Sequence, residues 1–178
     1  ARIQDANPKK RAIHKGKEVS VSYTLMEFSP FGDMASLIDN GKLPKDEVLA
    51  RTFFHHLIEG LEYLHSNGIA HLDLKLEKLM LGTDYRLKIF GFETCQHIKE
   101  FGNIKSSGTV DYRAPELMDM SCENPFPADI YSAGVILFIL KFHFFPYVED
   151  LDVDGYYLHE LLVNGDEQFW SAQNKIRG

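Results

Sequence analysis

The sequence has few cysteines: its 178 residues include only Cys95 and Cys122, which are not spaced as a C-x-x-C pair. So low a count argues against a disulfide framework, and the spacing argues against a cysteine zinc site. We therefore expect both thiols to be free in a reducing compartment, and we predict a soluble, cytoplasmic protein.

Long apolar segments are also lacking. The most apolar run, residues 133–140, is followed by Lys141 and is too short to cross a bilayer. The first twenty residues are charged and contain no apolar core, so no signal peptide is visible. We expect no membrane partner, and we expect residues 133–140 to lie in a buried helix.

An excess of positive charge is absent as well. The chain has 19 Lys and Arg against 26 Asp and Glu, for a net charge of -7, which argues against a nucleic-acid partner. The basic residues that do cluster lie near the start of the chain and are Lys9, Lys10, Arg11, Lys15 and Lys17. A solvated loop or strand edge is the favoured interpretation of this cluster, and a binding patch is the alternative.

The segments that are present predict one mixed α+β domain dominated by helix. With 44% hydrophobic and 25% charged residues, the chain can bury a substantial core. The expected elements are strands within 19–28, a short helix over 33–39, a hairpin of 79–81 and 87–89, an irregular segment over 94–110, and helices over 128–142 and 155–163.

The clearest helix is predicted over residues 44–66. Pro44 suits a first helical position, and Asn67 with Gly68 is a stop signal. Apolar residues recur along one stripe at helical spacing, and they are Val48, Leu49, Phe53, Phe54, Leu57, Ile58, Leu61 and Leu64. We expect this stripe to pack on the helix over 128–142.

Five short motifs are distributed along the chain. Residues 71–78 read HLDLKLEK, which is similar to the catalytic loop H-R-D-L-x-x-x-N of protein kinases. Residues 61–69 resemble the helix and turn that precede this loop, and residues 23–33 resemble the strand and hinge that hold adenine. Ala114, Pro115 and Glu116 match the A-P-E that ends the activation segment. Residues 129–134 resemble the start of the central buried helix.

From about residue 19 to residue 170 the chain resembles the eukaryotic-type serine/threonine protein kinases, and most of all the calcium/calmodulin-dependent and AMP-activated group. The resemblance implies a partial kinase domain over 1–178. Residues 1–28 would be the end of the small lobe with the hinge strand, and 29–178 would be most of the helical C-terminal lobe. The implied partners are ATP or another nucleotide and a protein substrate or protein partner.

Three residues match the family's catalytic positions. Asp73 holds the position of the residue that accepts the substrate hydroxyl proton, and Lys75 that of the lysine that steadies the transferred phosphoryl group. Thr109 would hydrogen-bond near both. Lys75, two residues after the Asp, is the serine/threonine form of the loop.

The family's magnesium positions are altered. Lys78 replaces the catalytic-loop Asn, and Gly91 stands where the Asp of D-F-G is expected. Neither offers a side-chain oxygen to a hard cation, although Glu93 could act as a substitute ligand. Metal charge stabilisation contributes several kcal/mol, so losing both ligands is expected to slow transfer roughly a thousandfold or more.

The resemblance also implies nucleotide contacts. The backbone of Glu27 and Ser29 would bond the base, and Met26 would lie behind it. Asp33 would reach the ribose, and Met80 would form the floor. A Gly-rich phosphate loop and a V-A-I-K lysine are not found before residue 23, so any ATP binding is expected to be weak, and binding of Mg²⁺ is doubtful.

Three functions remain open from the sequence. The chain could be part of a kinase that is active in its full-length form, a pseudokinase that binds or scaffolds, or a remnant without function. Leu72 stands in place of the Arg that pairs with a phosphorylated activation loop, which suggests that residues 94–110 are not ordered in that way. The altered metal positions favour the pseudokinase.

Overall fold

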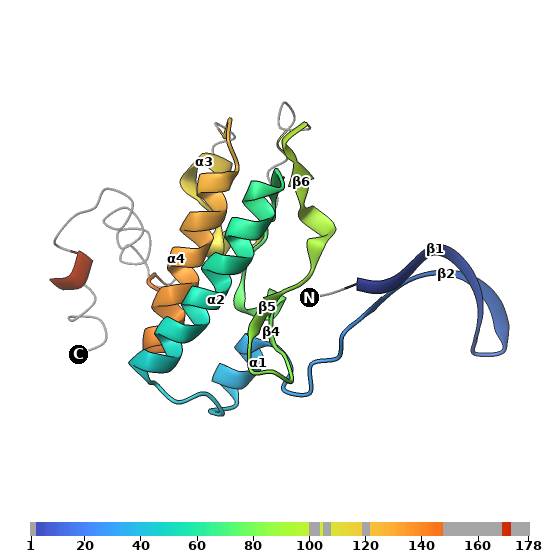
Figure 1. Cartoon of the computed structure of the whole chain (residues 1–178), viewed down its shortest axis with the longest axis horizontal. Helices are drawn as coiled ribbons and strands as arrows, with labels where there is room; N and C mark the ends of the chain where they lie inside the picture. The colour runs from blue at the N-terminus through green and yellow to red at the C-terminus, as the bar shows by residue number, and fades with distance from the viewer. Residues whose placement is uncertain (1–2, 100–103, 105–107, 119–121, 148–168, 172–178) are drawn as a thin grey trace.

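The computed structural model describes residues 3–99, 104, 108–118, 122–147 and 169–171. They form a mixed α+β structure, as predicted, and Figure 1 shows its elements. In chain order these are β1 (Ile3–His14), β2 (Lys17–Met26), α1 (Met34–Asp39), α2 (Glu47–Ser66), β3 (Ile69–Ala70), η1 (Leu76–Lys78), β4 (Leu79–Leu81), β5 (Leu87–Ile89), η2 (Phe92–Thr94), β6 (Gln96–His97), η4 (Val110–Tyr112), α3 (Pro115–Met118) and α4 (Phe126–Phe142). The helix predicted over 155–163 lies outside the described residues.

Helix α2 is one continuous helix, as expected, but it begins at Glu47 and not at Pro44. Asp46 caps it, because its side-chain Oδ1 accepts a hydrogen bond from the backbone N–H of Leu49 at 2.8 Å. A capping carboxylate satisfies an N–H that has no partner within the helix. The cap therefore fixes the start, and Pro44 precedes the helix.

One face of α2 is buried, by Ala50, Phe53, Leu57, Leu61 and Leu64. These positions follow the helical spacing of the predicted stripe. Val48, which the prediction placed in that stripe, is instead 71% exposed. It lies two residues before Ala50 and so points to the opposite side of the first turn.

Helix α4 begins two residues before the predicted residue 128 and is apolar on almost every side. It packs lengthwise against α2, which confirms the expected pairing of the two helices (Figure 1). Their contact forms the centre of the core, where Leu57, Leu61, Ile136 and Leu140 are almost fully buried. Among the described helices, none is both long and apolar enough to cross a membrane.

The predicted hairpin of β4 and β5 is confirmed, with Leu79 opposite Ile89 and Leu81 opposite Leu87. The pairing continues one step beyond the strands, because the N–H of Phe90 donates to the carbonyl of Lys78 at 3.0 Å. The hairpin therefore brings Lys78, which precedes β4, next to Phe90, which follows β5.

Strands β1 and β2 form a long antiparallel hairpin that extends away from the helices (Figure 1). The sequence predicted the second strand but not the first. Lys15 and Gly16 make the two-residue turn, both with positive φ, as a tight hairpin requires. The basic cluster lies on this hairpin and is exposed, which agrees with a solvated strand edge.

Candidate functional site

The segment 71–73 is held in place by Asp129, which lies in the first turn of α4. The Asp129 carboxylate is 1% exposed, and its oxygens accept hydrogen bonds from the N–H groups of His71 and Leu72, both at 2.8 Å. The Nε2 atom of His65 lies 2.9 Å from Asp129 Oδ2. A buried carboxylate with three partners is fully satisfied and fixes the path of the loop.

His71 is fully buried and links this loop to the end of β5. Its Nε2 lies 3.2 Å from the carbonyl oxygen of Phe90, and its Nδ1 lies 3.4 Å from the backbone nitrogen of Asp73. Burial lowers the pKa of His71, so the ring is neutral near pH 7. In that form Nε2–H donates to Phe90 and Nδ1 accepts from Asp73.

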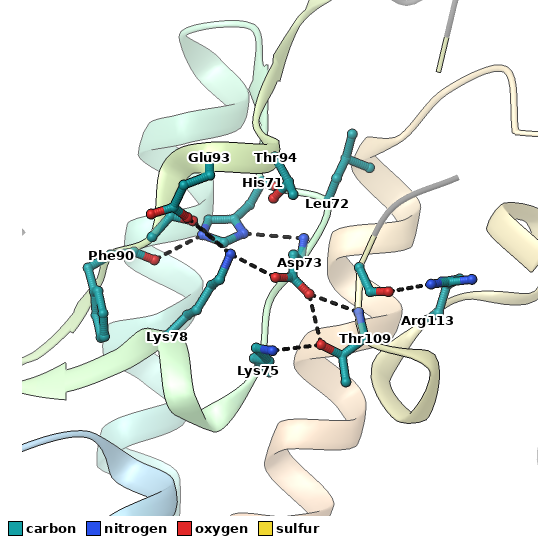
Figure 2. Close-up of polar contacts among 12 residues, drawn as sticks. His71, Leu72, Asp73, Lys75, Lys78, Phe90, Glu93, Thr94, Thr109 and Arg113 are labelled. Carbon is teal, nitrogen blue, oxygen red and sulfur yellow. Dashed lines mark hydrogen bonds and ion pairs between the residues drawn. The ribbon is translucent and has the colours of Figure 1, made fainter. Parts of the chain in front are cut away.

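Asp73, Lys75 and Thr109, the three predicted catalytic residues, lie together (Figure 2). Asp73 Oδ1 accepts from the backbone N–H of Thr109 at 2.8 Å and from its hydroxyl at 3.0 Å. The Lys75 ammonium donates to Thr109 Oγ1 at 2.8 Å. The segment that carries Thr109 approaches closely because Gly108 lacks a side chain: a Cβ there would lie 2.6 Å from the carbonyl oxygen of Leu72.

Lys78 occupies the other side of Asp73. Its Nζ lies 2.7 Å from Asp73 Oδ2, 3.1 Å from the carbonyl oxygen of Gly91 and 3.3 Å from Glu93 Oε2. Figure 2 shows the Lys78 side chain reaching between Asp73 and Glu93. The two oxygens of Asp73 therefore face different partners, Thr109 on one side and an ammonium on the other.

The charges in this cluster support one another. Burial alone would raise the pKa of Asp73, but the hydrogen bond and positive charge of Lys78, with the Thr109 hydrogen bonds, outweigh it and hold that pKa below its ordinary value. Burial opposes the charge of Lys78 too, and the hydrogen bonds and negative charges of Asp73 and Glu93 raise its pKa. Both groups are charged at neutral pH.

Gly91 and Lys78 fit against each other. Gly91 has a φ of 78°, in the left-handed region that glycine adopts without strain. A Cβ at this position would lie 2.8 Å from Cδ, 3.0 Å from Cε and 3.1 Å from Cγ of Lys78. The lysine stem thus fills the space that a side chain at residue 91 would need.

The residues at the family's magnesium positions do not fit a metal ion. The oxygens of Asp73, Gly91 and Glu93 already surround an ammonium, which repels a second cation. Among the described residues, no group of three or more His, Cys, Asp or Glu side chains is placed to hold a metal ion. Glu93, the suggested substitute ligand, pairs with Lys78 and is 76% exposed.

The predicted nucleotide residues lie along β4 and the segment before α1. Asp33 forms an isolated β-bridge with Met80, and the hydroxyl of Ser29 donates to the carbonyl of Leu81 at 2.7 Å. Met26 ends β2, and Glu27 pairs with Lys88 of β5, with 2.6 Å between Oε1 and Nζ. Ser29, Asp33 and Met80 are thus close neighbours. Glu27 reaches the same hairpin through Lys88, the partner of Met80, while Met26 is the last residue of the protruding β1–β2 hairpin.

Asp33 already has a structural role. It caps α1, because its Oδ1 accepts from the backbone N–H of Ser36 at 2.8 Å and its Oδ2 from the Ser36 hydroxyl at 2.9 Å. A ribose hydroxyl at Asp33 would share the carboxylate with these two donors.

Leu72 lies in a small apolar cluster near the A-P-E segment. It is 4% exposed and packs with Ala70, Ala114, Leu117 and Ala128. Its φ is 63°, which is an uncommon value for a leucine. The hydrogen bond from the Leu72 N–H to the Asp129 carboxylate stabilises this conformation. Pro115 and Glu116 open α3, which contributes Leu117 to this cluster.

Two residues that hold the site were not among the predicted site residues. Asp129 was recognised only as part of a helix start, and His65 only as a residue of α2. A single carboxylate in the first turn of an otherwise apolar helix was the available signal, since such a group needs buried donors. The contact of Lys78 with Asp73 was not predicted either.

Comparison with known proteins shows what this arrangement resembles. Residues 11–168 match the family model described as protein kinase domain. CBL-interacting serine/threonine-protein kinase 8 of Arabidopsis thaliana is 36% identical over 138 residues, which are 76% of this chain and 30% of that protein. Maternal embryonic leucine zipper kinase of Danio rerio is 34% identical over 144 residues, 79% of this chain and 21% of that protein.

CBL-interacting protein kinase 26 of Oryza sativa subsp. japonica is 36% identical over 129 residues, 70% of this chain and 26% of that protein. The chain thus spans less than a third of these curated relatives. Among solved structures, the yeast RNA Pol II CTD kinase CTDK-1 complex matches with a TM-score of 0.66 at 22% identity, over 84% of this chain and 48% of that one. This last likeness concerns the fold alone.

Proposed function

This chain belongs to the serine/threonine protein kinase family, and we propose that it is a catalytically impaired member, a pseudokinase that keeps the fold and acts by binding. The observation that carries the proposal is the ion pair of Lys78 with Asp73. We assign residues 1–28 to the end of the small lobe with the hinge strand and 29–178 to most of the C-terminal lobe.

Phosphoryl transfer needs a carboxylate that is free to take the proton of the attacking hydroxyl. In this chain Asp73 Oδ2 pairs with an ammonium at 2.7 Å and Oδ1 accepts two hydrogen bonds from Thr109. Its pKa is held below the ordinary value, so it is a weak base. The carboxylate that we propose as the proton acceptor is therefore both occupied and weakened.

The family's metal ion would neutralise charge on the phosphates and orient them when bound. The oxygens of this site surround Lys78, so we propose that the chain does not recruit that ion. ATP or another nucleotide would then bind weakly, along Met26, Glu27, Ser29, Asp33 and Met80, and a protein partner would be the more important ligand.

An active kinase in a longer form of the protein is the second candidate. The arrangement of Asp73, Lys75 and Thr109 favours it, because Asp73 and Lys75 both lie within hydrogen-bond distance of the Thr109 hydroxyl. A remnant without function is the third candidate, and the buried core shared by α2 and α4 argues against it.

A phosphotransfer assay with radiolabelled ATP on serine/threonine peptides tests the proposal. We expect no detectable transfer by the chain. Robust transfer that Asp73→Ala abolishes would overturn the proposal in favour of an active kinase. Transfer that survives Asp73→Ala would point to a contaminating kinase in the preparation, so that variant is an essential control.

A further inference from the structure

We propose that the Lys78 ammonium is the resident cation of the site, which joins the loop carrying Asp73 to the segment after β5 and excludes a divalent cation from the position it occupies. The inference deepens the proposed function and rests on it. Lys78 is a positioning residue here, since it acts through the oxygens that it holds together.

The first argument is the set of oxygens around Nζ. Asp73 Oδ2, the carbonyl oxygen of Gly91 and Glu93 Oε2 lie 2.7, 3.1 and 3.3 Å away, and they come from two separate segments of the chain. Carboxylate and carbonyl oxygens are the ligands that hard cations take in proteins. An ammonium is a compact point charge with three donors, and it has three such acceptors here.

The second argument is the match between Lys78 and Gly91. The lysine stem lies where a Cβ at residue 91 would be, within 2.8 to 3.1 Å of that point, and the Lys78 side chain is only 15% exposed. The hairpin register holds residues 78 and 90 together, so the stem has a fixed origin beside Gly91. The packing of the Lys78 stem therefore fixes the position of its ammonium.

The third argument is charge. Asp73 and Glu93 together carry two negative charges, and Lys78 neutralises one of them within 3.3 Å. Removing the ammonium leaves two carboxylates and a carbonyl oxygen facing one point without a cation. Such a set attracts a divalent cation, whereas the ammonium repels one.

Lys75 offers a matched control on the same loop. Its ammonium contacts the hydroxyl of Thr109 at 2.8 Å, and no ion pair of Lys75 is found among the described residues. Replacing Lys75 with Met removes the same charge and the same hydrogen-bonding group as replacing Lys78 with Met. It leaves the three oxygens around Lys78 occupied.

The experiment measures Mn²⁺ binding to the full chain by electron paramagnetic resonance, without nucleotide. We expect Lys78→Met to bind Mn²⁺ about tenfold more tightly than the parent, or better, because it exposes the oxygen set. Lys75→Met should gain much less, because the Lys75 ammonium contacts Thr109 and does not occupy the three oxygens. The double variant Lys78→Met/Glu93→Gln should lose most of the gain, since one of the carboxylates is then neutral.

Equal Mn²⁺ affinity in the parent and in Lys78→Met would overturn the inference, as would an equal gain in Lys75→Met. Lys78→Gln, which keeps a polar side chain without the charge, repeats the test if circular dichroism shows that Lys78→Met is unfolded. Peptide phosphorylation by the parent would refute the proposed function but would leave the Mn²⁺ comparison to decide the role of Lys78.

Discussion

The Lys78 ammonium and the Asp73 carboxylate form an ion pair with 2.7 Å between Nζ and Oδ2, and the two side chains are 15% and 11% exposed. In the family pattern, position 78 is an Asn that binds the metal ion, and position 73 is the Asp that accepts the proton of the substrate hydroxyl. Here the two side chains neutralise each other. On the roles proposed for these positions, Lys78 both replaces a metal ligand and occupies the base.

This ion pair should make stability depend on pH at the acidic end. The pKa of Asp73 in the folded chain lies below its ordinary value of 3.8, so its stabilising contribution is fully present above 3.8 and is lost as the pH falls through the folded pKa. Lys78→Met removes the ammonium that lowers this pKa. We therefore expect the variant to be less stable than the parent at pH 6, with a difference that narrows toward pH 3.

Urea unfolding at several pH values measures this difference. Lys75→Met is the control, because the Lys75 ammonium contacts Thr109 and its charge lowers the Asp73 pKa less than Lys78 does. Its pH-dependent difference from the parent should therefore be smaller. A gap between the parent and Lys78→Met that stays constant from pH 6 to pH 3 would show that the lysine stabilises by packing alone.

Asp129 should be among the most sensitive positions for stability. Asp129→Ala leaves the N–H groups of His71 and Leu72 and the ring of His65 without their acceptor in a buried place. Each such loss costs about 1–3 kcal/mol, so we expect the free energy of unfolding to fall by about 3 kcal/mol or more. Chemical denaturation gives the value, and the amide NMR signals of residues 71 and 72 should shift.

The control is Asp39→Ala, an exposed carboxylate at the end of α1. It should change stability by no more than about 0.5 kcal/mol. Similar losses for the two variants would mean that Asp129 does not anchor the loop.

Leu72 should stabilise the chain through packing. It is 4% exposed among Ala70, Ala114, Leu117 and Ala128, and Leu72→Ala leaves a cavity there. Alanine keeps a Cβ, so the strain of the positive φ is unchanged and only packing is lost. We expect a fall of about 2–3 kcal/mol in the free energy of unfolding. Val48→Ala, at a 71% exposed position, should cost no more than about 0.5 kcal/mol.

The sequence predicted the elements better than the contacts of the site. The turn residues between 81 and 87 were enough to predict the hairpin, and the hairpin register puts Lys78 beside Phe90. The direction of the Lys78 side chain depends on the single turn η1, for which the sequence carries no periodic signal. The ion pair with Asp73 therefore could not be predicted from pattern.

Competing local signals explain the errors in the elements. Pro44 and Asp46 are both helix-start signals, and the side chain of Asp46 prevails because it binds the N–H of Leu49. Strand β1 was missed because its charged residues and Pro8 interrupt any alternation of apolar and polar positions. Its pairing with β2 shifts register between Asn7 and Lys10, around that proline, which has no N–H to give.

Nucleotide binding should be weak and little affected by magnesium. The metal positions hold Lys78 and Gly91, and the Lys78 ammonium takes up the oxygens of Asp73, Gly91 and Glu93. Thermal unfolding with ATP, in Mg²⁺ and in EDTA, measures the effect. A large stabilisation by ATP that appears only with Mg²⁺ would show that a residue such as Glu93 has left Lys78 to bind the ion.

Restoring the family's metal ligands should recover part of the chemistry, and the two substitutions should depend on each other. Gly91→Asp alone places a Cβ 2.8 Å from Cδ of Lys78, so the new carboxylate meets the lysine stem and pairs with its ammonium. Lys78→Asn alone frees Asp73 but supplies only one ligand. Lys78→Asn/Gly91→Asp removes the stem and supplies ligands from both sides, as an ion that bridges the phosphates requires.

The test is the radiolabel assay on a longer form of the protein with a complete small lobe, comparing the parent, both single variants and the double variant. We expect no detectable transfer by the parent and partial recovery of transfer in the double variant. Either single variant should recover less transfer than the double variant. Adding Asp73→Ala to the double variant should abolish the recovered transfer. Equal recovery in Lys78→Asn alone would mean that masking of Asp73 was the whole defect. Full activity in the parent would show that neither Lys78 nor Gly91 impairs the enzyme.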